Sequence, residues 1–249
     1  MTSTQSARYL PAGESALIVE FGNAIDKSLV DAVSNLRSHI EALQESQRLT
    51  GVLETIPTFR SLAIIIDPLH TSIDVVQEIL ETYPVSGSVQ RASAGTAWRL
   101  PVCYHKDYGP DLDFVAKASG LSSEEVISTH NQTPYQVYLL GFQPGYGFLG
   151  NTKPELHLPR RTEPRVRIPK GSVAIALKLT CVYPWESPGG WHLLGQCPVP
   201  MFDANANRPT LLSPTDQVRF EPVSVVDFTA LKSDCERGQL NWANWVDSA

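Results

Sequence analysis

The sequence lacks long apolar runs and a surplus of basic residues, and each absence excludes a class of protein. No stretch of its 249 residues approaches the length of a membrane-spanning helix, and the first eight residues lack the apolar core of a signal peptide. The net charge of -6 excludes a general nucleic-acid binder, because neutralising phosphates requires a basic surface. We therefore expect a protein that resides in the cytosol.

Several standard motifs are also missing. There is no Gly-x-x-x-x-Gly-Lys phosphate loop, no Gly-x-Gly-x-x-Gly fingerprint and no Gly-x-Ser-x-Gly nucleophile elbow. The six histidines show no His-x-His or His-x-x-x-His spacing, so no metal site is predicted. No Cys-x-x-Cys pair occurs, and we expect reduced and mostly buried thiols at Cys103, Cys181, Cys197 and Cys235.

What is present predicts two domains of mixed helix and strand. In the first half, apolar residues at helical spacing follow a capping residue at Asp26 and again at Thr71. Strands are expected at 16–21, 52–56, 62–66 and 98–104. The order strand, helix, two strands, helix indicates a small split β-α-β domain over residues 1–90. Residues 98–104 could supply the last strand of this domain. Residues 85–96 are rich in serine and glycine and are typical of a linker.

The second half, residues 91–249, has a different texture. Two short helices are predicted at 111–120 and 122–129. They are followed by short strands expected at 136–140, 172–182, 192–195, 210–212 and 217–223. Many short strands with frequent Gly and Pro turns favour a closed or sandwich-like β structure. Residues 227–248 are predicted to form a helical tail docked by Trp242 and Trp245.

The stretch 135–191 carries the strongest indication of a site. Residues 140–150 place four glycines and a proline among large apolar residues, which predicts a shaped loop because glycine permits positive φ and proline fixes φ. A second turn follows at 169–172, and 183–191 contain two tryptophans. These features suggest a surface that holds a polar, anionic molecule. Ordinary β-turns are the alternative interpretation, since Gly and Pro mark turns in any β-rich domain.

Arg160, Arg161 and Arg165 lie between prolines at 159, 164 and 169. Guanidinium groups hold carboxylates or phosphates at two points, and the prolines keep the backbone extended. These arginines are therefore candidate anion ligands, with a basic solvated edge as the alternative.

His130 and His105 are the candidate general acids or bases. His130 precedes the strand that leads into the glycine-rich loop, and His105 lies in a polar loop. For each, the alternative is a structural or solvent-facing histidine, and no residue is assigned as a nucleophile.

An ordered series of motifs resembles a known family. They are Gly13 to Leu17, Pro57-x-x-Arg60-Ser61-Leu62, Pro101 to Tyr104, Tyr108 to Leu112, Gly141 to Tyr146, Pro159-Arg160-Arg161, Pro169-x-Gly171-Ser172-Val173 and Ser187 to Trp191. The chain is similar to the B subunit of bacterial ATP-dependent 5-oxoprolinase, also described as allophanate hydrolase subunit 1, and to the related sporulation-kinase inhibitor. The match spans nearly the whole sequence.

The resemblance implies a small N-terminal α+β domain followed by a cyclophilin-like β-barrel domain. It also implies partners, namely a second, homologous cyclophilin-like subunit and a third subunit. Together they would form an enzyme that cleaves the lactam of 5-oxoproline to L-glutamate at the expense of ATP, with ATP bound by the complex. The substrate-binding residues would be Phe142, Gln143, Pro144, Gly145, Tyr146, Arg160, Arg161, Arg165, Ser187, Gly189, Gly190 and Trp191.

Two other functions remain open at this point. One is a carboxyltransferase-type component of a biotin-dependent urea or amide carboxylase, and the other is a non-catalytic inhibitor of a histidine kinase. The inhibitor function is favoured by a departure from the family's sequence pattern. Many members of the family read Gly-Ile-Ala-Gly-x-Gln-Thr-Gly, and in the same stretch this chain has Leu177, Leu179 and Cys181. Our hypothesis is that a polar ligand contact is lost there, which would change the substrate or end catalysis.

Overall fold

The computed structural model describes residues 7–82, 95–239 and 241–247. The chain divides into two compact units, Met1–Ala94 and Gly95–Ala249. Each unit has its own buried hydrophobic cluster. Nearly all of the predicted linker, residues 85–96, lies outside the described residues.

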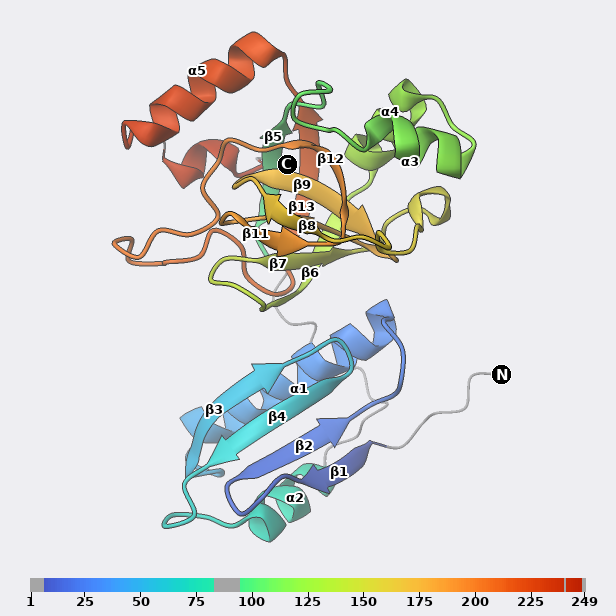
Figure 1. Ribbon diagram of the computed structural model, residues 1–249. Helices are drawn as coiled ribbons and strands as arrows, with labels where there is room; N and C mark the ends of the chain where they lie inside the picture. Colours follow the sequence, from blue (N-terminus) through green and yellow to red (C-terminus); the bar gives the residue numbers. More distant parts are fainter. Residues whose placement is uncertain (1–6, 83–94, 240, 248–249) are drawn as a thin grey trace. The chain divides into compact units, whose positions relative to one another are not determined.

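The first unit is a four-stranded antiparallel sheet with two helices on one face (Figure 1). The strand order is β1-β2-β4-β3. The elements are β1 (Arg8–Pro11), β2 (Ala16–Glu20), α1 (Lys27–Glu45), β3 (Val52–Pro57), β4 (Ser61–Ile66) and α2 (Ile73–Glu81). Alternate residues of β2 and β4, among them Leu17 and Ile64, are buried in the core because successive side chains of a strand point to opposite faces.

Two details of this unit differ from the sequence prediction. The fourth strand is β1, not residues 98–104, which belong to the second unit. Helix α2 begins one residue later than expected, because the Ser72 side chain, not that of Thr71, accepts the hydrogen bond from Val75 N–H. The cap of α1 is as predicted, with Asp26 accepting from Ser28 N–H at 2.8 Å.

The second unit is built around a seven-stranded sheet in the order β12-β9-β10-β7-β6-β13-β5. Its strands are β5 (Ala97–Val102), β6 (Tyr135–Leu140), β7 (Gly147–Gly150), β9 (Ser172–Ala176), β10 (Leu179–Val182), β12 (His192–Gln196) and β13 (Gln217–Pro222). A separate pair joins β8 (Arg165–Ile168) to β11 (Ser187–Gly189). Cys103 and Gln196 exchange backbone hydrogen bonds of 2.9 and 3.0 Å across the two edges, so the sheet is a nearly closed barrel.

Helices cover the outside of this barrel, α3 and α4 lying side by side and α5 standing apart from them (Figure 1). The bounds are α3 (Leu112–Ser119), α4 (Ser123–Gln132), η1 (Pro154–Leu156), α5 (Val225–Glu236) and η2 (Trp242–Trp245). Helix α4 has the predicted capping box, in which Ser122 and Glu125 satisfy each other's backbone N–H groups. Trp242 and Trp245 pack against the barrel core as expected.

Two strand predictions in this unit are wrong, and three short strands were not predicted. Residues 172–182 form a hairpin, β9 and β10, whose turn at Leu177 has a positive φ of 56°. Residues 210–212 contribute only an isolated bridge between Phe202 and Thr210. Strands β7, β8 and β11 were not predicted, because each has only three or four residues and carries glycine or charged side chains. None of the helices in the described ranges is long and apolar enough to cross a membrane.

Candidate substrate-binding surface

Tyr146 is the centre of an aromatic cluster that gathers three of the segments singled out in the sequence. Its ring centroid lies 5.3 Å from Phe142, 4.8 Å from Phe148, 5.2 Å from Tyr183 and 6.4 Å from Trp191. We call these five residues the Tyr146 cluster. The glycine-rich loop, the end of β10 and the segment 187–191 therefore converge in space.

Tyr146 itself is a structural donor. It is 2% exposed, and its hydroxyl donates to the Cys181 Sγ at 3.0 Å. Burial raises the pKa of Tyr146 far above its ordinary value, so the phenol stays neutral. Tyr146 therefore orders the cluster and transfers no proton near neutral pH.

The loop 141–146 is a tight turn, as predicted from its glycines. Phe142 and Gly145 have positive φ values of 69° and 80°. A Cβ at Gly145 would stand 2.8 Å from the Met201 carbonyl oxygen, so only glycine suits this close approach. Phe142 is 65% exposed, and its positive φ is strained for a bulky residue. The loop thus holds an aromatic ring at the surface, although aromatic side chains favour burial and bulky residues favour negative φ.

Arg160 and Trp191 form the polar edge of the cluster. The guanidinium of Arg160 lies 6.0 Å from the centroid of the Trp191 ring, and Arg160 is exposed. Within the residues that the structure describes, it has no carboxylate partner. Arg161 N–H donates to the Gly190 carbonyl at 2.7 Å, which ties the arginine segment to segment 187–191. Arg160 therefore presents an unpaired positive charge next to the Trp191 ring, which is itself only 4% exposed.

Asp111 holds the other two predicted arginines. Arg165 donates to both of its carboxylate oxygens at 2.8 and 2.7 Å, Arg161 donates to Oδ1 at 3.1 Å, and Leu193 N–H donates to Oδ2 at 2.8 Å. Burial alone would raise the pKa of Asp111, but these hydrogen bonds and charges outweigh it and lower the pKa. Arg161 and Arg165 are thus partly neutralised, and Arg160 is left as the free cation.

Ser187 and Gln143 carry buried polar atoms without a partner. Within the described part of the chain, neither the Ser187 Oγ nor the Gln143 Oε1 has a hydrogen bond, although few buried polar groups in proteins lack one. Both residues are among the predicted substrate ligands. Gly189 and Gly190 follow Ser187 in the same segment, and a Cβ at Gly189 would stand 2.6 Å from the Tyr183 hydroxyl.

The two candidate histidines lie outside this surface. His130 is fully buried, with Nδ1 2.7 Å from the Tyr104 hydroxyl and Nε2 3.0 Å from the Thr180 hydroxyl. Burial lowers its pKa to about 3, so the ring is neutral and has no access to a substrate. His105 is exposed and lies 3.3 Å from Asp107 in a polar turn. The structural interpretation therefore describes His130, and the solvent-facing one describes His105.

The departures from the family pattern are distributed over the β9–β10 hairpin. Leu177 lies in the exposed turn, whereas Leu179 and Cys181 are buried at 3% and 0% exposure. Cys181 contacts the Tyr146 cluster by accepting a hydrogen bond from the Tyr146 hydroxyl. The changed side chains at 179 and 181 therefore do not reach the exposed surface.

Sequence reasoning did not name Asp111, Tyr183 or Phe148 as a site residue, although Tyr183 and Phe148 lie in segments that it singled out. Asp111 precedes α3 and looks like a helix cap, yet its side chain makes no capping hydrogen bond. The role of Asp111 is indicated by its contacts with two arginines. These arginines lie 50 and 54 positions away in the sequence, so the contacts can be recognised only in the folded structure.

The chain has the two-unit organisation of a carboxyltransferase-type domain. A profile described as "Carboxyltransferase domain, subdomain C and D" matches residues 7–212. The chain belongs to this family. Within it the chain belongs to the group of 5-oxoprolinase B subunits, because two relatives with that name match it over nearly their whole length.

Two relatives and two solved structures give the extent of the similarity. The chain is 38% identical to the 5-oxoprolinase B subunit of Bacillus subtilis, covering 89% of this chain and 95% of that one. It is 36% identical to the Escherichia coli O157:H7 protein of the same name, covering 88% and 97%. The crystal structure of TTHA0988 matches with a TM-score of 0.72 at 34% identity over 85% of this chain, which spans 40% of that longer one.

The Kluyveromyces lactis urea carboxylase structure matches with a TM-score of 0.73 at 21% identity, covering 94% of this chain and 23% of that one. At this identity the likeness concerns the fold alone. The expected α+β arrangement with a cyclophilin-like barrel is confirmed.

Proposed function

We propose that this chain is the B-type component of a complex that cleaves the lactam of 5-oxoproline to L-glutamate at the expense of ATP. The observation that carries the proposal is the 38% identity to a 5-oxoprolinase B subunit over 95% of that protein. The partners would be a second, homologous cyclophilin-like subunit and a third subunit. ATP would be held by the complex, since this chain has no familiar phosphate loop.

The Tyr146 cluster and Arg160 suit such a substrate. 5-Oxoproline carries a carboxylate on a nearly flat five-membered lactam ring. Arg160 would hold the carboxylate, and the exposed ring of Phe142 would contact the lactam ring. Arg161 and Arg165, fixed by Asp111, would keep the local potential positive.

The chemistry needs activation of a stable amide. The lactam oxygen would attack the γ-phosphorus of ATP, releasing ADP. A first water would add to the activated carbon so that the C–N bond breaks and an acyl phosphate forms, and a second water would cleave the acyl phosphate to L-glutamate and phosphate. Three of the five N–H groups in the loop 141–146 are used in its own turn, those of Gly141, Gln143 and Tyr146. The N–H groups of Phe142 and Gly145 would stabilise the developing negative charge.

A second candidate function rests on the description of the family. A carboxyltransferase-type component would hold a small amide while carboxylate moves to it from biotin, and the matched profile bears that name. The same arginine and aromatic side chains would then face a urea-like amide. This function requires a biotin-carrier partner.

Reconstitution separates the two functions. The chain is co-expressed with a second, homologous cyclophilin-like subunit and a third subunit, the complex is purified, and ATP hydrolysis is measured with and without 5-oxoproline. The proposal expects hydrolysis that depends on 5-oxoproline and on this chain. Turnover by the partners without this chain would overturn it, and biotin-dependent carboxylation of an amide would support the second function instead.

A further inference from the structure

A cavity lies in the barrel unit and adjoins the surface described above through Tyr183. Its volume is about 400 Å³, and none of the twelve predicted substrate-binding residues lines it. Four segments enclose it: the turn between β8 and β9, the segment between β10 and β11, the loop that follows β12 and one side of α5. A cavity of this volume lies within the range of small-molecule sites in proteins.

The inner wall of this cavity is apolar. Val199, Met201 and Phe228 all line it, and each is at most 2% exposed. Prolines of the three barrel segments add rigid apolar surface around them. The inner part of the cavity therefore suits an aliphatic or aromatic group rather than a polar one.

The entrance carries an excess of positive charge. Lys170 and Lys232 come from different elements, and neither has a carboxylate partner within the part of the chain that the structure describes. The Lys170 ammonium lies 5.2 Å from the centroid of the Trp185 ring. Of the two glutamates in the lining, Glu186 is held by Arg167 at 2.9 and 3.0 Å.

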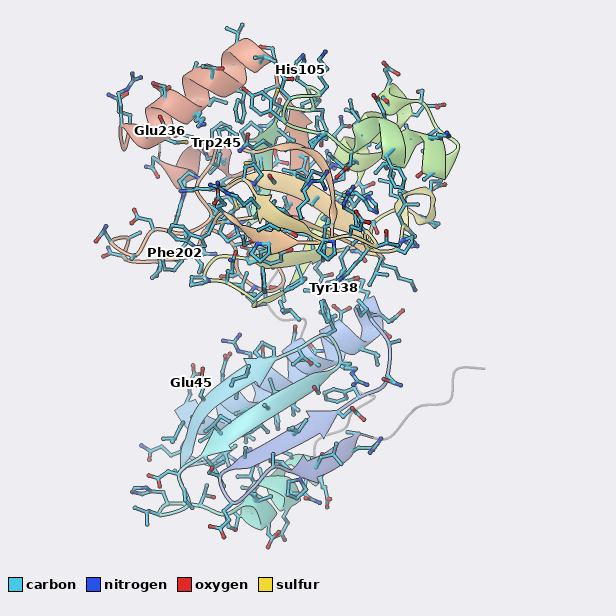
Figure 2. All side chains as sticks on the ribbon, viewed as in Figure 1. Glu45, His105, Tyr138, Phe202, Glu236 and Trp245 are labelled. Atoms are coloured by element: carbon cyan, nitrogen blue, oxygen red, sulfur yellow. The ribbon has the colours of Figure 1, made fainter. Side chains whose placement is uncertain are left out.

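Glu236, near the end of α5 in Figure 2, is the remaining carboxylate and offsets one of the two lysines. The two ammonium groups and this one carboxylate leave a net charge of about +1 at the entrance, which matches a monoanion.

We propose that this cavity is a binding site for a small amphipathic monocarboxylate. The apolar tail contacts Val199, Met201 and Phe228, and the carboxylate lies between Lys170 and Lys232. A neutral apolar molecule would leave both ammonium groups unpaired, and a dianion would meet Glu236. Tyr183 lines the cavity and also packs against Tyr146, so the two sites share one side chain.

Cys235 provides a reporter of occupancy without any assay of activity. It lines the cavity and is the one cysteine of the four that is not buried. Burial raises its pKa to about 11, so alkylation is measured at pH 8.5, where a small thiolate fraction reacts. Octanoate serves as the probe, octanol as its neutral counterpart, and N-ethylmaleimide labels the thiol, with the modified peptide identified by mass spectrometry.

The expected result is that octanoate slows alkylation of Cys235 and that octanol does so at least about tenfold less well. Lys232→Glu should weaken protection by octanoate by about tenfold or more. Lys117→Glu, the same change at an exposed position of α3, should leave it unchanged. Circular dichroism confirms that both variants are folded.

The proposal is overturned if octanoate gives no protection at millimolar concentration, if octanol protects equally well, or if Lys117→Glu weakens protection as much as Lys232→Glu. The measurement uses the whole chain alone, so its result is independent of whether the complex cleaves 5-oxoproline.

Discussion

The barrel unit contains two aromatic clusters associated with β10, and they differ in how their polar groups are satisfied. Thr180 contacts the His130 cluster, formed by Tyr104, His130, Tyr135 and Phe220, while Cys181 contacts the Tyr146 cluster. Successive residues of a strand point to opposite faces, so the two clusters approach β10 from its two sides.

The His130 cluster is closed. Its members are at most 7% exposed, and both ring nitrogens of His130 have hydroxyl partners. The Tyr146 cluster is open, because it ends on exposed Phe142 and on the unpaired guanidinium of Arg160. Aromatic richness alone does not distinguish a core from a site. The unpaired charge and the exposed ring do.

The largest effect is expected when the arginines beside the open cluster lose their carboxylate. Asp111→Ala should destabilise the protein by about 3 kcal/mol, the lower end for breaking a buried ion pair, because both arginines are partly exposed. Urea unfolding measures the change. Asp107→Ala, which removes an exposed carboxylate of the same loop, should change stability by less than about 0.5 kcal/mol. Equal effects of the two variants would show that Asp111 is not the anchor.

The second-largest effect is expected from acidification, which should lower the free energy of unfolding through the closed cluster. The pKa of His130 is about 3 in the folded state and 6.5 when unfolded, so below pH 6.5 the unfolded chain takes up a proton that the folded chain excludes. Stability is therefore lost as the pH falls from 6.5, by about 1.4 kcal/mol for each unit that this residue alone controls.

The measurement is unfolding free energy at pH 6.5 and 4.5 for the natural chain and for His130→Gln, which does not titrate. The variant should lose about 2–3 kcal/mol less over this interval. Parallel pH profiles of the two proteins would contradict the closed description of this cluster.

The smallest effect concerns the hairpin that serves both clusters. Leu177 has φ 56° where many members of the family have glycine, and it is 44% exposed. Leu177→Gly should raise the free energy of unfolding by about 0.5–1 kcal/mol, because glycine removes the left-handed strain. Leu177→Ala removes the same side chain but keeps the strain. If both variants change stability alike, side-chain contacts and not the backbone control this position.

Much of the fold was predictable from local patterns. Helices α1, α2, α3, α4 and α5 follow from apolar spacing and capping residues, and β2, β4 and β13 from apolar runs. The hairpin turn at Leu177 was missed because leucine gives no turn signal. β1 was missed as a strand because it is four residues long and ends at Pro11. Short edge elements depend on their neighbours more than on their own residues.

The candidate surface was predictable in part. The glycine-rich loop, Arg160 and Trp191 do meet around Tyr146, as motif reasoning predicted. Its division into one free and two neutralised arginines was not predictable, because Asp111 lies about 50 residues away in sequence. His130 stayed ambiguous for the same reason, since burial and hydroxyl partners are set by tertiary packing.

The central claim is that Arg160 of the open cluster holds the substrate carboxylate. The most direct test compares kcat/KM for 5-oxoproline in complexes assembled with Arg160→Ala and with Arg219→Ala, an exposed arginine of β13. We expect Arg160→Ala to lower kcat/KM by about 100-fold, equivalent to about 2.7 kcal/mol, at unchanged stability, and Arg219→Ala to retain activity. Equal kcat/KM values for the two complexes would contradict the claim.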